Sequence, residues 1–77
     1  MKVRVSLHGD VHRYRAGRPD PFEEELAEGA TVAELVELIG IDPAMTITIG
    51  LNGELGRREA VLREGDDVLI LTPMEGG

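Results

Sequence analysis

The stretch EGDDVLILTP, residues 64–73, decides the fold of this chain. A Gly-Asp turn opens it, and an uninterrupted run of aliphatic residues follows. A strand that is apolar at successive positions is typical of one that is paired on both sides. We therefore predict a central strand at residues 67–72, around which the other elements are arranged.

Two other segments alternate between apolar and polar residues, as half-buried strands do. Residues 2–8 place Val3, Val5 and Leu7 on one side. Residues 46–51 alternate in the same way and end at an Asn-Gly pair, which is a strong turn signal. We predict a strand in each segment.

Residues 22–28 and 54–63 carry weaker patterns. The first segment contains three successive glutamates, which suit an edge strand because charge discourages unwanted pairing. For the second segment we expect either a short strand or a single helical turn, with Leu62 as its apolar anchor.

A short helix is predicted at residues 32–39. Thr31 is a good N-cap, and Glu34 three residues later completes a capping box. Gly40 supplies the left-handed stop. The apolar residues at helical spacing are Val32, Leu35, Val36 and Ile39.

These elements predict an α+β fold of the ubiquitin-like β-grasp type. A mixed sheet of four to five strands would pack on one main helix. Hairpin logic makes the first two strands antiparallel neighbours, and the last strand fills the centre if the helix crosses one face. We expect the domain to span residues 1–72 and a flexible tail to span residues 73–77.

Residues 9–21 contain two prolines and two glycines, and we expect them to be irregular. A solvated loop is favoured over a partner-specific contact. Three arginines, Arg13, Arg15 and Arg18, could touch phosphate, but a solvated basic loop is again the favoured interpretation. His8 and His12 are four positions apart in a turn context, so we expect no shared metal ion.

Composition restricts the functional classes. The chain has 77 residues, a formal net charge of −7 and no cysteine. Net negative charge disfavours nucleic acid and anionic membranes as partners. No apolar run approaches the roughly 18 residues of a membrane span, and no signal peptide is recognisable, so we expect a cytoplasmic protein. Ser6 is the only serine, and catalysis by the chain's own side chains is not expected.

The chain ends in Gly76-Gly77. Two residues without a Cβ atom give a narrow, adaptable backbone that can thread a tight channel. The α-carboxylate at such an end is unhindered and ionised at neutral pH. It could attack the α-phosphate of a nucleotide that another protein positions.

The order of motifs resembles the small sulfur-carrier proteins of the ThiS/MoaD family, which serve thiamine and molybdopterin biosynthesis. LNGELG at 51–56, LREGDDVLILTP at 62–73 and the Gly-Gly ending carry the resemblance, and EGATVAEL at 28–35 extends it. The stretch 9–21 does not match well. Glu75 departs from the small or apolar residues that often precede the glycines.

This resemblance implies a carrier rather than an enzyme. An E1-like enzyme would use ATP to adenylate the Gly77 carboxylate, and a sulfur donor would convert it to a thiocarboxylate. Gly76 would supply reach, and no cofactor would be bound intrinsically. The accepting partner would be a synthase of the molybdopterin synthase large subunit or thiazole synthase type. The Thr72-Pro73 exit favours the molybdopterin type slightly.

The last strand also predicts a partner surface. Since successive side chains alternate between faces, we assign Val68 and Ile70 inward and Leu69 and Leu71 outward. An exposed apolar patch beside the tail would mark a partner surface, unless another element covers it. The expected partner-binding residues are Leu69, Leu71, Pro73 and Met74.

An alternative function remains open at this point. The chain could be a non-catalytic ubiquitin-like interaction module with a disordered glycine tail. Deletion of Gly76 and Gly77 would leave such a module functional but would abolish the activity of a carrier.

Overall fold

The computed structural model describes residues 1–73 of the chain. The predictions that involve Met74, Gly76 and Gly77 lie outside the described residues. The elements follow in the order β1 (Lys2–His8), the 3-10 helix η1 (Gly9–Arg15), β2 (Phe22–Glu25), α1 (Val32–Ile39), β3 (Thr48–Leu51), β4 (Glu54–Leu55) and β5 (Asp67–Leu71).

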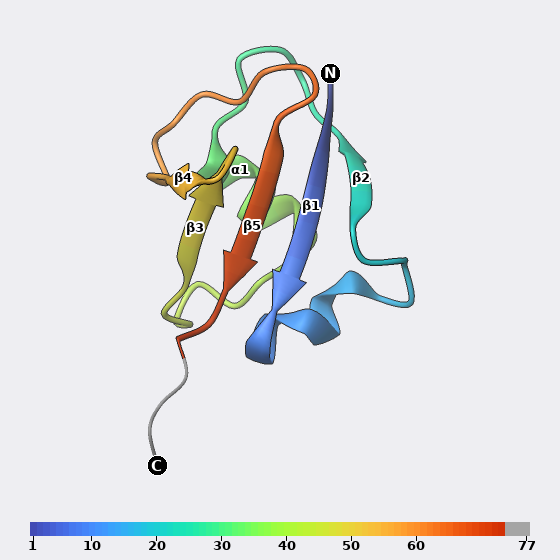
Figure 1. Ribbon diagram of the computed structural model, residues 1–77, viewed down its shortest axis with the longest axis vertical. Helices are drawn as coiled ribbons and strands as arrows, with labels where there is room; N and C mark the ends of the chain where they lie inside the picture. The colour runs from blue at the N-terminus through green and yellow to red at the C-terminus, as the bar shows by residue number, and fades with distance from the viewer. Residues whose placement is uncertain (74–77) are drawn as a thin grey trace.

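The strands form one mixed five-stranded sheet in the order β2-β1-β5-β3-β4. β5 runs parallel to β1 and antiparallel to β3, so it is paired on both sides, as its apolar sequence predicted. β1 and β2 are antiparallel neighbours, also as predicted. α1 crosses one face of the sheet, which confirms the α+β β-grasp architecture (Figure 1).

α1 has the bounds that the sequence predicted. The Glu34 backbone N–H donates to Thr31 Oγ1 at 3.3 Å, and the Thr31 backbone N–H donates to Glu34 Oε1 at 3.4 Å, which completes the capping box. Gly40 ends the helix with a φ of 88°, a left-handed conformation that favours glycine.

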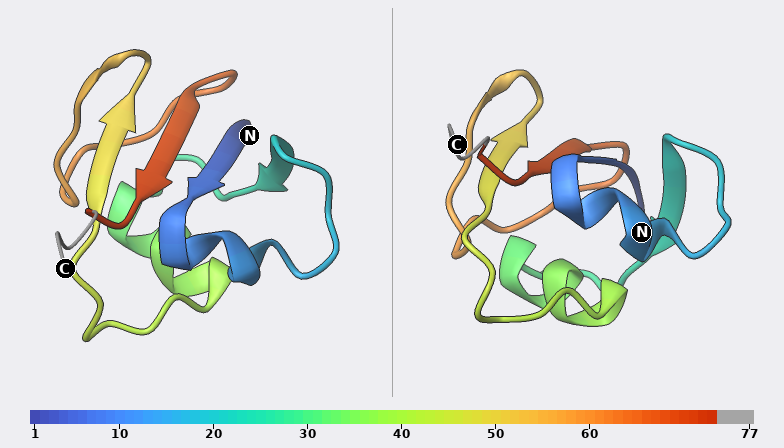
Figure 2. Two further views of the ribbon diagram at one scale, coloured as in Figure 1. Left: turned by 60° about the horizontal axis from the view of Figure 1, so that its bottom comes forward. Right: turned by 90° about the horizontal axis from the view of Figure 1, so that it is seen from below.

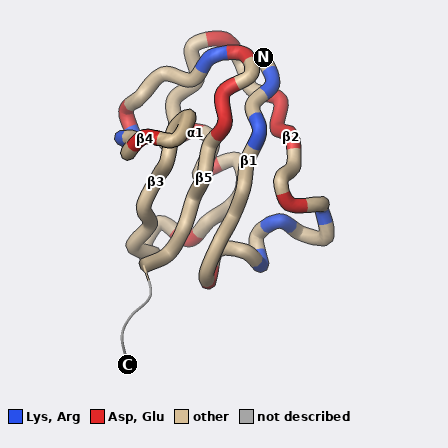
Figure 3. The backbone as a smooth tube through the Cα atoms, viewed as in Figure 1, with Lys and Arg blue, Asp and Glu red and all other residues tan. Residues whose placement is uncertain are grey.

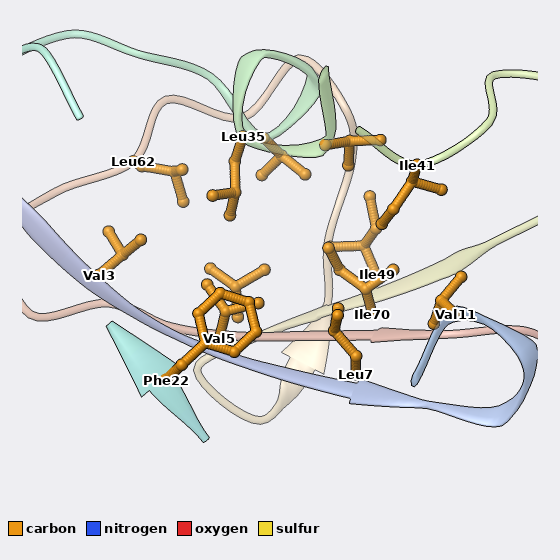
Figure 4. Packing of buried hydrophobic residues seen from close by; sticks show 13 residues of the cluster. Val3, Val5, Leu7, Val11, Phe22, Leu35, Ile41, Ile49, Leu62 and Ile70 are labelled. Carbon is orange, nitrogen blue, oxygen red and sulfur yellow. The ribbon is translucent and has the colours of Figure 1, made fainter. Parts of the chain in front are cut away.

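The core lies between α1 and the inner face of the sheet (Figure 4). Val68 and Ile70 are 2% and 0% exposed, so their predicted inward orientation is confirmed. Leu62 is buried too, which confirms it as the anchor of its segment. Val3, Val5 and Leu7 of β1, Phe22 of β2 and Ile49 of β3 also belong to this layer.

Three strands are shorter than predicted because their partners end. β5 stops at Leu71 rather than at residue 72, opposite His8, the last residue of β1. β2 stops at Glu25 rather than at residue 28, since Glu25 is already opposite Lys2, the first residue of β1. β3 begins at Thr48 rather than at residue 46, because Thr48 is opposite Leu71, the last residue of β5. In the weakly patterned segment, β4 is the short strand that was one of the two expectations.

The prediction of an irregular, solvated loop was wrong for the first half of residues 9–21. Residues 9–15 form η1, whose Val11 is 0% exposed and points into the same cluster as Leu7 (Figure 4). The Tyr14 hydroxyl donates to Met45 Sδ at 3.6 Å and accepts from the Asp42 backbone N–H at 3.4 Å. Contacts with distant segments therefore order this stretch.

Within residues 1–73, no helix is long and apolar enough to cross a membrane.

Candidate functional site

The root of the tail lies at the end of β5, at the opposite end of the molecule from the N-terminus (Figure 1). The Thr72 backbone N–H donates to the His8 carbonyl at 3.3 Å, which extends the pairing of β5 with β1 by one bond. Thr72 Oγ1 accepts a second bond, at 2.7 Å, from the Asp10 backbone N–H. The point from which residues 73–77 leave the domain is therefore anchored to the β1–η1 corner.

The sheet face turned away from α1, here called the outer face, adjoins this root (Figure 2). Its middle is apolar, because Leu69 and Leu71 of β5 point to it from the strand that carries the tail. Gly50 of β3 is opposite Leu69 and has no side chain, so the face is hollowed there. The remaining lining includes Ser6, Thr48 and Leu55.

Charged groups border the outer face on the side away from the tail. Arg4 Nε lies 3.6 Å from Asp67 Oδ1, and both side chains are 62% exposed, so this ion pair contributes little to stability. Both acidic and basic residues lie near the N-terminal end of the molecule (Figure 3). The apolar middle of the outer face thus lies between a charged border and the root of the tail.

The outward orientation of Leu69 and Leu71 is confirmed, although each is only partly exposed. Among residues 1–73, no helix or strand crosses over the outer face (Figure 2), so the covering element considered above is not found there. Pro73 is exposed at the root. The assignment of these three residues to partner binding stays a prediction.

Leu55 is an outer-face residue that the sequence analysis missed. It is 83% exposed and pairs with Gly50 across the β3–β4 hairpin. A signal was available in the sequence, because Leu55 is an apolar residue two positions after the Asn-Gly turn. Strand side chains alternate between the two faces of a sheet, so its side chain could be assigned to a face. The short, weakly patterned segment hid that alternation.

The arginines near η1 have partners within the chain. The Arg18 guanidinium stacks 3.9 Å from the Phe22 ring centroid and forms an ion pair with Glu24. Arg15 Nη1 donates to the Arg18 carbonyl at 2.8 Å. These contacts give the two guanidinium groups structural roles, in line with the preference against a phosphate site.

Arg13 has an electrostatic effect on its neighbour. Its Nη2 atom donates to the Tyr14 hydroxyl at 3.4 Å. This hydrogen bond, followed by the bond from the Asp42 backbone N–H, lowers the pKa of Tyr14 below its ordinary value.

The two histidines share one carboxylate. His8 Nε2 and His12 Nε2 lie 4.0 Å and 3.7 Å from Asp20 Oδ2. In the part of the chain that the structure describes, no group of three His, Cys, Asp or Glu side chains is placed to hold a metal ion. Both imidazoles thus face the Asp20 carboxylate, in the segment before β2, at distances longer than a hydrogen bond.

Comparisons with known proteins place this geometry in context. The family model described as "ThiS family" matches residues 12–77. Among solved structures, molybdopterin converting factor subunit 1 of Pyrococcus furiosus is 31% identical; the match covers 96% of this chain and 99% of that chain with a TM-score of 0.73. Among curated proteins, none matched the sequence significantly.

Two other solved structures share the fold at lower identity. SAMP1 of Haloferax volcanii is 21% identical, with 100% of both chains covered and a TM-score of 0.77. A chain in the complex of subunits 1 and 2 of the molybdopterin-converting factor of Helicobacter pylori is 22% identical, with 100% of both chains covered and a TM-score of 0.64.

Proposed function

Because the chain belongs to the ThiS family, we propose that it is a sulfur carrier in molybdopterin or thiamine biosynthesis. The observation that carries the proposal is the family match, which runs to Gly77 and so includes the Gly76-Gly77 ending. The likeness to molybdopterin converting factor subunit 1 of Pyrococcus furiosus supports the molybdopterin pathway, which we favour slightly. The Thr72-Pro73 exit from β5 points the same way.

The reactive group in this proposal is the Gly77 carboxylate. A carboxylate is a poor electrophile, so it must first be activated. Its oxygen attacks the α-phosphate of ATP in an E1-like enzyme, and pyrophosphate leaves. Hydrosulfide, released by a sulfur donor, then attacks the acyl carbon, AMP leaves with the carboxyl oxygen that bound it, and loss of a proton leaves a thiocarboxylate. ATP is a substrate of the partner enzyme, and the chain itself acts as a carrier.

The folded body supplies the docking surface. Leu55, Leu69 and Leu71 place apolar side chains on the outer face beside the root of the tail. Exposed apolar surface with a charged border is typical of protein-binding sites. We assign the outer face, together with Pro73 and Met74, to contacts with the activating enzyme and the sulfur-accepting synthase. The Helicobacter pylori complex of subunits 1 and 2 supports a synthase partner.

Pyrophosphate exchange tests the activation step. The chain is incubated with E1-like enzymes from its own cell, ATP and labelled pyrophosphate. Exchange that depends on the chain and is lost on deletion of Gly76 and Gly77 is the expected result. A chain that supports no exchange with any of these enzymes contradicts the proposal and favours an interaction module.

A pair of leucine variants tests the docking surface. Leu55→Ser changes an exposed leucine of the outer face, whereas Leu38→Ser changes one that is 55% exposed on α1, on the other side of the sheet. We expect Leu55→Ser to raise the KM for the carrier about fivefold or more, since apolar contact area at the interface is lost. Leu38→Ser should leave the KM unchanged. Equal effects in both variants would exclude the outer face as the docking surface.

A further inference from the structure

Thr72 is held from two sides by the β1–η1 corner. Its backbone N–H donates to the His8 carbonyl, and its Oγ1 accepts from the Asp10 backbone N–H at 2.7 Å. Gly9, between these two partners, has a φ of 75° and packs directly against Thr72. A Cβ atom at Gly9 would overlap Thr72 Oγ1 and lie 3.1 Å from the Thr72 carbonyl oxygen. Only glycine therefore allows this close approach.

This corner lies outside the part of the chain that carries the family likeness. The ThiS family model begins at residue 12, after Gly9 and Asp10. The same corner begins η1, which Val11 and Tyr14 attach to the core and to the segment before β3. Thr72 is thus anchored to a segment that is itself fixed by tertiary contacts. The direction in which the chain leaves β5 is determined at that point.

Anchoring matters because the reactive carboxylate lies beyond a short reach. Residues 73–77 span at most roughly 17 Å at about 3.4 Å per residue. An end group on a tether of this length is delivered at an effective concentration that depends on where the tether starts and how freely it moves. Release of Thr72 would add one more mobile residue to the tether and widen the range of directions in which the tail leaves β5.

We propose that Thr72 is a positioning residue: its hydroxyl, held by the Gly9-Asp10 corner, aims the tail so that the Gly77 carboxylate reaches the partner's reaction centre. This inference rests on the proposed function. Thr72 takes no part in the chemistry. It acts through the corner, and the outer face provides docking separately.

The test compares four full-length variants: Thr72→Val, Thr72→Ser, Thr46→Val and Gly9→Ala. Thr72→Val keeps the shape of the side chain but removes the acceptor, and Thr72→Ser keeps the hydroxyl. Thr46→Val makes the same chemical change at an exposed threonine in the loop before β3. Hydrogen exchange at the Asp10 amide reports whether the corner has opened. Pyrophosphate exchange with the activating enzyme and ATP gives kcat and KM for each carrier.

We expect Thr72→Val to lower kcat about three- to tenfold, the range that follows from loss of one hydrogen bond. Its KM should stay close to that of the unaltered chain, because the docking face is intact. Asp10 amide exchange should accelerate in Thr72→Val and remain slow in Thr72→Ser and Thr46→Val, which should keep their kcat. Gly9→Ala places a Cβ atom against Thr72 and so disturbs the same contact from the η1 side; it should reproduce the kcat loss.

Each other outcome overturns the inference. If Thr72→Val accelerates Asp10 amide exchange but leaves the kcat of pyrophosphate exchange unchanged, anchoring has no functional role. If only its KM rises, Thr72 contacts the partner directly. If Thr72→Ser fails as Thr72→Val does, the hydroxyl is not the relevant group. If the unaltered chain supports no pyrophosphate exchange, the proposed function fails, and this inference fails with it. If the unaltered chain is active and only the expected effect of Thr72→Val is missing, this inference fails alone.

Discussion

α1 and η1 are helical segments of eight and seven residues that are specified in different ways. α1 has a capping box, a regular apolar stripe and a terminal glycine, all of which act within the segment. η1 has no side-chain cap, and His8 before it is extended. It is held by Val11 in the core and by the contacts of Tyr14 with Asp42 and Met45.

The two helical segments also differ in role: α1 stabilises the domain, and η1 positions the root of the tail. α1 covers the inner face of the sheet and provides core contacts, whereas η1 begins at the corner that anchors the tail. Loss of a contact in α1 should therefore lower the stability of the whole domain. Loss of a contact in η1 should also loosen the root of the tail.

The largest effect is expected in α1. Leu35 is 0% exposed, so Leu35→Ala leaves a cavity in the core and should lower the free energy of unfolding by about 3 kcal/mol. Leu38→Ala is the matched control, since Leu38 is 55% exposed on the same helix and should change stability by about 0.5 kcal/mol or less. Chemical denaturation measures both. Similar losses in the two variants would contradict the assigned core.

A smaller loss is expected for η1. Val11→Ala removes two buried methyl groups and should cost about 2 kcal/mol, and it should also accelerate amide exchange at Asp10. His12→Ala, at the neighbouring position whose side chain is 45% exposed, should cost about 0.5 kcal/mol or less. A Val11→Ala variant as stable as the unaltered chain would show that η1 is not anchored by the core.

The helix cap is expected to contribute less again. Thr31→Ala removes the acceptor for the Glu34 backbone N–H and should lower the free energy of unfolding by about 1 kcal/mol. Thr46→Ala is the control, since Thr46 is exposed in a loop. Thermal unfolding followed by circular dichroism compares the two. Equal midpoints would mean that α1 does not depend on its local cap, and the contrast with η1 would weaken.

The smallest effect is a spectroscopic one in η1. Tyr14 is the only tyrosine and the chain has no tryptophan, so ultraviolet absorbance reports its ionisation directly. The hydrogen bond from Arg13 favours the phenolate, so the pKa of Tyr14 should lie below its ordinary value of 10.0. Arg13→Gln should raise that pKa, because the hydrogen bond from the guanidinium and then its charge are removed, while Arg15→Gln should not. No change in Arg13→Gln would contradict the contact.

The same contrast explains what could be predicted from the sequence. α1 and the central position of β5 were predictable because capping, spacing and apolar runs act within a few residues. The ends of β2 and β3 were not, because each strand stops where its partner stops. η1 was missed because a lone Val11 and Tyr14 give no periodic signal, and their partners are distant in sequence. At the site, the orientation of Leu69 and Leu71 followed from strand alternation. Leu55 was missed because its strand is too short to show that alternation, and the Thr72 anchor depends on tertiary contacts.

The central claim, that Gly77 carries sulfur, is tested most directly by intact-protein mass spectrometry on the chain purified from its own cell. We predict a species in which one oxygen is replaced by sulfur, and fragmentation should place it at Gly77. Oxidation of Met45 or Met74 gives a nearly equal mass change, so the position must be fixed in this way. An unmodified tail that also stays inert to ATP and every E1-like enzyme of that cell would contradict the account and identify the chain as an interaction module.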